Sequence, residues 1–148
     1  MFAMSVWKHG SIALTCAVLA LAAASLPAKA DPARDAILAD YAAQAVKADP
    51  AFKGFSAQRG EAVYATKHAD AKPETPACQA CHGEDPRQAG RNAKTGKTID
   101  PMAVSANPQR FTNRDDVEKW FGRNCKEVLG RDCTALEKGD YITFLSSR

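Results

Sequence analysis

The chain has 148 residues, with 20 lysines and arginines against 17 aspartates and glutamates. Removing Lys8 and Lys29 with an N-terminal leader leaves 18 basic residues against 17 acidic ones, a balance that gives no case for a nucleic-acid partner. Outside residues 1–30, only 26 of 118 residues are cysteines or large apolar and aromatic residues, which excludes two domains and is thin even for one. We therefore expect long loops, or a bound group that fills the centre.

Residues 1–30 have the pattern of a secretory signal peptide. A mildly basic start precedes an apolar stretch over residues 11–24, and Ala28-Lys29-Ala30 then offers small residues to a signal peptidase. The alternative is a retained membrane anchor, but the stretch is shorter than the roughly 20 residues that span a bilayer. We predict cleavage after Ala30, export to a bacterial periplasm, and no membrane span in the mature protein.

The mature chain is predicted to begin with a helix over residues 31–48. Asp31-Pro32 supplies an N-cap and a proline at the first helical position, and Asp49-Pro50 ends the helix. Its apolar residues recur at helical spacing: Ile37, Leu38, Tyr41 and Ala45. Residues 31–54 are interpreted as an N-terminal helical extension of the domain that follows.

A second helix is predicted over residues 57–67, with Ser56 as its N-cap. Gly60 lies one turn before Tyr64, and a glycine on a helix face often lets another helix approach, although a helix can also merely tolerate it. Residues 69–110 then show no sustained periodicity and contain five prolines: Pro73, Pro76, Pro86, Pro101 and Pro108. A structureless stretch of about 40 residues is long for a compact domain, so we expect it to wrap around something.

Two more helices are predicted at the C-terminal end. One covers residues 113–129 and is capped by Thr112 or Asn113, and the other covers residues 134–146 and opens with a capping box, Thr134 to Glu137. No segment alternates in the manner of a strand. The predicted fold class is therefore all-α, with helices joined by long connections.

The most specific motif is Cys78-Gln79-Ala80-Cys81-His82. In an exported protein, C-x-x-C-H is the attachment signal for c-type haem. Two thiols at this spacing reach the two vinyl groups on one side of the porphyrin, and the adjacent histidine places an imidazole on the iron. We predict one haem c, attached through Cys78 and Cys81 with His82 as a metal ligand, which would also supply the missing apolar volume.

The other cysteines leave alternatives open. A thioredoxin-like redox pair would need strands that the sequence does not predict, and zinc held by four cysteines would leave both His82 and the thin core unexplained. If haem takes the first pair, Cys125 and Cys133 remain. In an oxidising compartment they can form a disulfide, the alternative being two buried free thiols.

The sixth iron ligand decides what such a protein does. Met102, the one methionine of the mature chain, follows His82 by only 20 residues, so we favour packing at the haem edge over ligation. Asn124 lies in the middle of an apolar helical stripe made of Val117, Trp120, Phe121 and Val128. A polar amide there needs a partner, which is a backbone carbonyl, a haem propionate or, in the interpretation we favour, the iron itself. Trp120 and Phe121 are expected to contact the haem.

The same region is basic through Arg114, Lys119, Arg123, Lys126 and Arg131. This pattern indicates either a solvated face or a surface for an acidic redox partner or for the haem propionates. His68, the other histidine of the mature chain, is interpreted as a surface or loop residue.

Over about residues 55–148 the chain resembles the sphaeroides haem protein family, an oxygen-binding, monohaem, c-type cytochrome family with a class I fold. The matching stretches are residues 78–82, 105–112, 117–125, 129–135 and 137–140. The resemblance implies His82 as proximal ligand, Asn124 as a distal ligand released when the iron is reduced, and a Cys125–Cys133 disulfide. It also implies a periplasmic or membrane-bound cytochrome as redox partner, and transient binding of oxygen, nitric oxide or a similar diatomic gas.

The interpretation that follows is a periplasmic cytochrome that combines electron transfer with gas binding and is not an enzyme. A carboxamide is a hard, weak ligand that suits ferric iron better than ferrous iron, so reduction would open the site. The alternatives are a plain electron carrier with His82 and Met102 as ligands and, less favoured, a haem enzyme acting on a diatomic or on peroxide.

Overall fold

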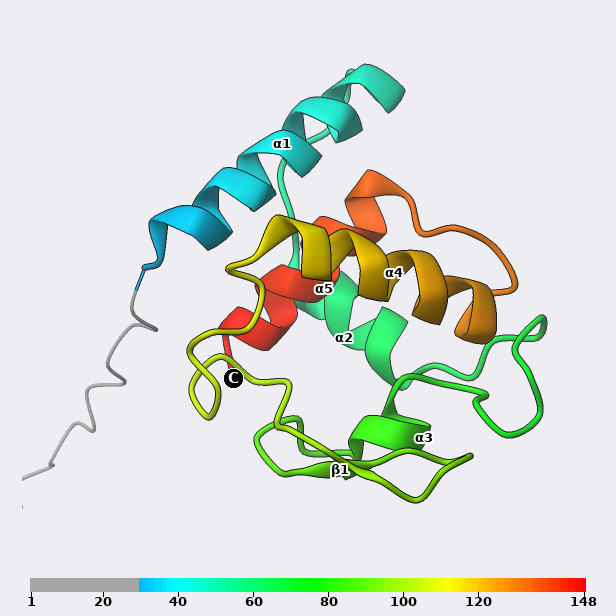
Figure 1. Cartoon of the computed structure of the whole chain (residues 1–148). Helices are drawn as coiled ribbons and strands as arrows, with labels where there is room; N and C mark the ends of the chain where they lie inside the picture. Colours follow the sequence, from blue (N-terminus) through cyan, green and yellow to red (C-terminus); the bar gives the residue numbers. More distant parts are fainter. Residues whose placement is uncertain (1–29) are drawn as a thin grey trace, which may run out of the picture.

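The computed structural model describes residues 30–148, so the predicted signal peptide lies outside the described residues apart from Ala30. The described residues form five helices (Figure 1): α1 (Pro32–Ala48), α2 (Ala57–Ala65), α3 (Gln79–His82), α4 (Arg114–Val128) and α5 (Ala135–Ser146). The predicted all-α class, with helices around a centre wrapped by long connections, is confirmed. No helix within residues 30–148 is long and apolar enough to cross a membrane.

The structure adds the one-turn helix α3 and a small hairpin, neither of which periodicity predicted. Strand β1 (Gly90–Arg91) pairs antiparallel with β2 (Thr98–Ile99), and the two form a short hairpin below α3. Two residues per strand are too few for an alternating pattern to be detected. The second predicted helix is also shorter than expected, because the backbone becomes extended at Thr66.

Short-range capping fixes the helix starts. The side chains of Asp31, Ser56 and Asn113 each accept hydrogen bonds from backbone amides of the first turn of α1, α2 and α4. Asn113 therefore caps α4, which decides between the two predicted candidates. The capping box of α5 is present, because Thr134 and Glu137 bond each other's backbone amides.

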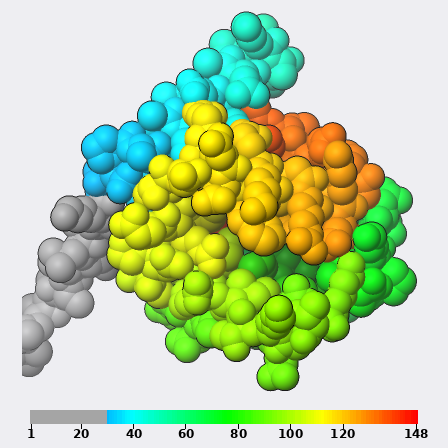
Figure 2. All heavy atoms as spheres, in the orientation of Figure 1, coloured from blue at the N-terminus to red at the C-terminus, as the bar shows by residue number. Residues whose placement is uncertain are grey.

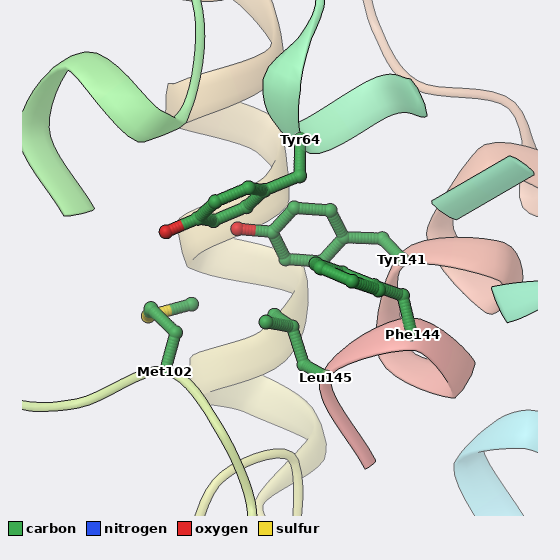
Figure 3. Packing of buried hydrophobic residues seen from close by; sticks show 5 residues of the cluster. All are labelled: Tyr64, Met102, Tyr141, Phe144 and Leu145. Carbon is green, nitrogen blue, oxygen red and sulfur yellow. The ribbon is translucent and has the colours of Figure 1, made fainter. Parts of the chain in front are cut away.

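Helix α5 is the centre of the packing. It lies against α2, where added side chains at Gly60 or Gly139 would overlap atoms of the opposite segment, and α1 packs across it as well. Ile37 and Tyr41 of α1 are buried with Ile142 of α5, so the N-terminal helix belongs to the same core. Figure 3 shows a second cluster around Tyr64 of α2: Tyr64, Met102, Tyr141, Phe144 and Leu145.

Candidate functional site

A cavity of about 520 Å³ lies between α4 on one side and α3 with the hairpin on the other. Figure 2 shows the surface recessed between these segments. Every haem-contacting residue predicted from the sequence lines this cavity: Cys78, Cys81, His82, Met102, Trp120, Phe121 and Asn124. The long irregular segment therefore encloses a volume typical of a ligand site.

The two thiols of the C-x-x-C-H motif lie on one wall of the cavity. Cys78 and Cys81 are half-buried and unpaired, and burial raises the pKa of the Cys78 thiol to about 11. The hairpin is pressed against them, since an added Cβ at Gly90 would overlap the Cys81 carbonyl and the backbone of His82. The Ala93 amide also donates to the Cys81 sulfur at 3.4 Å.

The imidazole of His82 is suited to bind a metal from this wall. Its Nδ1 atom is buried and has no hydrogen-bond partner within the described residues. Burial, and secondarily the charge of Arg110, lowers the pKa of His82 to about 4, so that the ring is neutral at physiological pH. A neutral imidazole keeps the lone pair that coordination requires. With two free thiols beside it and a partly apolar cavity above it, the site fits a covalently attached haem.

Asn124 reaches the cavity from the opposite helix, α4. It is half-buried between the buried residues Val117 and Val128, as the stripe predicted. Its side-chain amide forms no hydrogen bond within residues 30–148, so the backbone-carbonyl alternative is not supported. Phe121 packs edge-on against Tyr141, with ring centroids 5.7 Å apart.

Trp120 departs from the expected stripe because its side chain is 46% exposed. It lies at the rim of the cavity, where Lys119 and Arg123 approach its ring to 5.3 and 5.9 Å. The indole therefore lies just outside the buried face of α4, between two exposed cations.

Cys125 and Cys133 form a disulfide, with their Cα atoms 5.6 Å apart. This rules out both the zinc alternative and the pair of free thiols. Within residues 30–148 there is also no cluster of three or more residues of the His, Cys, Asp and Glu types that could hold a metal ion. The bridge joins the last turn of α4 to the segment that precedes α5, directly after Asn124.

Met102 is buried within the aromatic cluster of Figure 3 and also lines the cavity. Its backbone amide donates to the carbonyl of Pro86 at 2.9 Å, four residues after His82. The chain at Met102 is therefore still attached to the segment that follows the histidine, as the sequence separation suggested.

Ion pairs close one edge of the cavity. Lys94 of the hairpin lies 3.1 Å from the carboxylate of Glu127 on α4, and Lys72 lies 3.6 Å from the same group. The hydrogen bond from Lys94 lowers the pKa of Glu127. The two walls are thus joined by charges as well as by backbone.

The five basic residues near α4 are partly neutralised. Arg114 pairs with Asp40, Lys126 with Asp132 at 3.5 Å, and Arg131 with Glu137 at 2.7 Å. Lys119 and Arg123 remain at the rim beside Trp120. His68 lies in a loop with its Nε2 atom 3.3 Å from the Val63 carbonyl, as interpreted from the sequence.

Sequence reasoning missed several groups at the cavity. Arg110 and Phe111 line it from an irregular loop. Thr75, which is 5% exposed, also lines it, and its hydroxyl is buried without a partner within the described residues. These residues lie in segments without periodicity, so hydrophobic patterning carries no signal for them.

The sequence of the chain is similar to those of known proteins. A family described as "Domain of unknown function (DUF1924)" matches residues 50–145. The chain is 49% identical over 92 residues to the cytochrome c-type protein SHP of Cereibacter sphaeroides, covering 62% of this chain and 70% of that protein. It is 35% identical over 105 residues to cytochrome c'' of Methylophilus methylotrophus, covering 71% and 73%.

Solved structures agree with the fold. Oxidised SHP, described as an oxygen-binding cytochrome c, has a TM-score of 0.71 at 43% identity, covering 78% of this chain and 96% of that one. Oxidised cytochrome c'' of Methylophilus methylotrophus has a TM-score of 0.68 at 33% identity, covering 76% and 92%. These relatives bear the names of cytochromes rather than enzymes, in agreement with the interpretation from the sequence.

Proposed function

The chain belongs to the family of c-type cytochromes represented by SHP and cytochrome c'', and on that premise we propose that it is a periplasmic monohaem cytochrome that transfers electrons and transiently binds a diatomic gas. Residues 55–148 form the haem-binding domain, and residues 31–54 form its N-terminal extension. The observation that carries the proposal is that His82 and Asn124 line one cavity from two different helices, α3 and α4.

The residues of the first wall hold the cofactor. Cys78 and Cys81 attach one haem c through thioether bonds, and His82 supplies the proximal imidazole. Met102, Trp120 and Phe121 pack against it, and burial of the apolar porphyrin supplies the core that the side chains lack. When bound, the haem supplies a one-electron couple and a coordination position for a small gas.

Asn124 controls access to that position. Its amide is a hard, neutral donor that would hold ferric iron better than ferrous iron, so Asn124 would bind the oxidised iron and release the reduced one. The disulfide between Cys125 and Cys133 would limit how far the end of α4 can move and so keep Asn124 near that position. The relatives support this mode of action, since SHP is described as oxygen-binding and a structure of cytochrome c'' is described in terms of haem-ligand detachment.

The electron partner is a periplasmic or membrane-bound cytochrome. The support is the secretory pattern of residues 1–30, together with the two rim cations, Lys119 and Arg123, beside the exposed Trp120. Electron-transfer rates that do not change with salt would contradict an electrostatic contribution of these cations to docking.

The decisive experiment is ligand-binding spectroscopy on the mature holoprotein and on Asn124→Ala. We expect the oxidised wild type to lack a methionine-to-iron charge-transfer band and the reduced form to bind carbon monoxide and oxygen. Asn124→Ala should change the oxidised spectrum and bind exogenous ligands in both oxidation states, because nothing from α4 then competes. Gln109→Ala, another amide that lines the cavity, is the matched control and should behave as the wild type.

The second candidate is a plain electron carrier with His82 and Met102 as ligands. Burial of Met102 in the wall of the cavity is the observation that favours it. A methionine charge-transfer band in the oxidised protein, lost in Met102→Leu, would establish this candidate. It would also contradict the role of Asn124.

A further inference from the structure

Arg34 of α1 is a buried cation whose partners are carbonyl groups. Arg34 is only 4% exposed. Its Nε donates to the Arg110 carbonyl at 3.1 Å, and Nη2 donates to the Pro108 and Arg110 carbonyls at 2.7 and 3.0 Å. None of the ion pairs within residues 30–148 includes it. Burying a charge without a counter-charge is costly, and the three hydrogen bonds offset part of that cost. They also tie α1 to the loop that contains Pro108 and Arg110.

The loop that Arg34 holds is strained. Phe111 has a φ of 63°, the left-handed region that side chains rarely occupy, and no other non-glycine residue among those described has a positive φ. Such a conformation persists only where the surroundings enforce it, and it gathers at functional sites. Here the turn places the ring of Phe111 edge-on against Tyr141, with centroids 6.4 Å apart, in the wall of the cavity.

The strained loop also fixes Arg110 at the cavity. Its Nε donates to the Pro101 carbonyl at 3.0 Å and Nη2 to the Asp100 carbonyl at 2.8 Å. Arg110 is half-buried, lines the cavity, and takes part in no ion pair within the described residues. Its charge therefore acts on whatever occupies the cavity, with little screening by a neighbouring carboxylate.

We propose that Arg34 is a positioning residue for the cofactor. Acting from the N-terminal helix, it holds loop 107–111 so that Arg110 stays at the cavity wall and raises the reduction potential of the haem. A fixed cation favours the reduced iron, which carries one positive charge less than the oxidised iron. The inference rests on the proposed function only in requiring that a haem occupies the cavity, and it gives α1 a role that the sequence does not reveal.

The test is a redox titration of the holoprotein with Arg34→Met, Arg110→Met and the double variant. Each single variant should lower the ratio of reduced to oxidised protein at a fixed ambient potential by about tenfold, which is 59 mV for a one-electron couple. The double variant should fall no further, because Arg34 acts through Arg110. Arg110→Lys, which keeps the charge, should recover part of the loss.

Arg114→Met is the matched control, since Arg114 also binds α1, through Asp40, but on the exposed surface. It should leave the potential unchanged. Hydrogen exchange of the Arg110 amide, which donates to the Asn107 carbonyl at 3.0 Å, reports on the loop independently of redox behaviour. It should become about tenfold faster in Arg34→Met and stay unchanged in Arg114→Met.

Should Arg34→Met not fold, Arg34→Lys keeps the cation but cannot reproduce the three-bond fork, so the loop should exchange faster and the potential should fall by less. An unchanged potential in a folded Arg34 variant would overturn the proposal, as would effects of Arg34→Met and Arg110→Met that add. A chain that binds no haem at all would instead refute the proposed function, because no titration would be possible.

Discussion

Gly60 of α2 lies so close to α5 that a side chain at this position would overlap the backbone carbonyl of Asp140. The spacing of Gly60 and Tyr64 predicted a close helix approach, with simple tolerance as the alternative. This contact shows that the two helices do approach closely at Gly60 and that the glycine is not merely tolerated. Asp140 reinforces the junction, since its buried carboxylate accepts bonds from Arg59 Nε and the Ser56 amide, both at 2.6 Å.

Gly60→Ala is therefore expected to lower the free energy of unfolding by about 1–3 kcal/mol, because the added methyl group forces α2 and α5 apart. Gly122→Ala is the control: Gly122 lies inside α4 with nothing within 4 Å of an added Cβ. That change should be neutral or stabilise by up to about 1 kcal/mol through helix propensity. Denaturant unfolding measures both, and equal effects of the two variants would refute the packing argument.

The disulfide that follows Asn124 should stabilise the fold and restrain α4. Replacing both Cys125 and Cys133 by alanine should lower the free energy of unfolding by about 2–3 kcal/mol, the loop-closure value for a bridge between residues eight apart. Reduction of the wild type with dithiothreitol should give the same loss, and the double variant should no longer respond to it. A wild type whose stability is the same with and without reductant would contradict this role.

The start of α5 should make stability depend on pH. Bonds from Arg131, and then the backbone amide and hydroxyl of Thr134, lower the pKa of Glu137 to about 2, against about 4.3 in an unfolded chain. Because the folded pKa is the lower one, the stabilisation is complete above about pH 4.3 and is lost as the pH falls towards 2.

Glu137→Gln should cost roughly 1 kcal/mol at pH 7, and the difference from wild type should shrink over that acidic range. Urea unfolding as a function of pH tests this. The matched control is Glu61→Gln, since Glu61 forms an exposed pair with Arg148 and its loss should change stability by less than about 0.5 kcal/mol. A constant gap between Glu137→Gln and wild type from pH 7 to 3 would contradict the assignment.

Mass spectrometry of the exported protein tests the attachment residues. The mature chain should exceed the mass of its polypeptide by one haem, and replacing both Cys78 and Cys81 by alanine should remove that increment. Removing only one thiol should leave a single thioether bond and a haem that still resists extraction. The Cys125→Ala/Cys133→Ala protein is the control and should retain its haem. Loss of haem from this control would show that Cys78 and Cys81 are not the attachment residues.

Local chemistry in the sequence was enough to predict α1, α2, α4 and α5, whereas the one-turn helix α3 was not predicted. Asp31, Ser56 and Thr134 act within one turn of chain, so their neighbours specify the cap completely. The C-x-x-C-H motif and the stripe around Asn124 are likewise read over a few residues. The structure brings the residues of this motif and Asn124 to the same cavity.

Features that depend on distant segments could not be predicted in this way. Arg34 binds carbonyls 74 and 76 residues away, and no pattern in the sequence around Phe111 indicates its positive φ. Trp120 has the periodicity of a buried residue, yet the helix turns it to the rim. Arg110 and Thr75 lie in loops without periodicity, so no sequence pattern predicts that they line the cavity.

Helix α3 has only four residues, Gln79–His82, and it contains most of the attachment motif. A helix of one turn has no stability of its own in water, because nucleation alone costs more than a single turn returns. The helical conformation of this segment therefore depends on its surroundings, among them the hairpin at Gly90 and the Tyr64 hydroxyl, which donates to the Gly83 carbonyl at 2.6 Å.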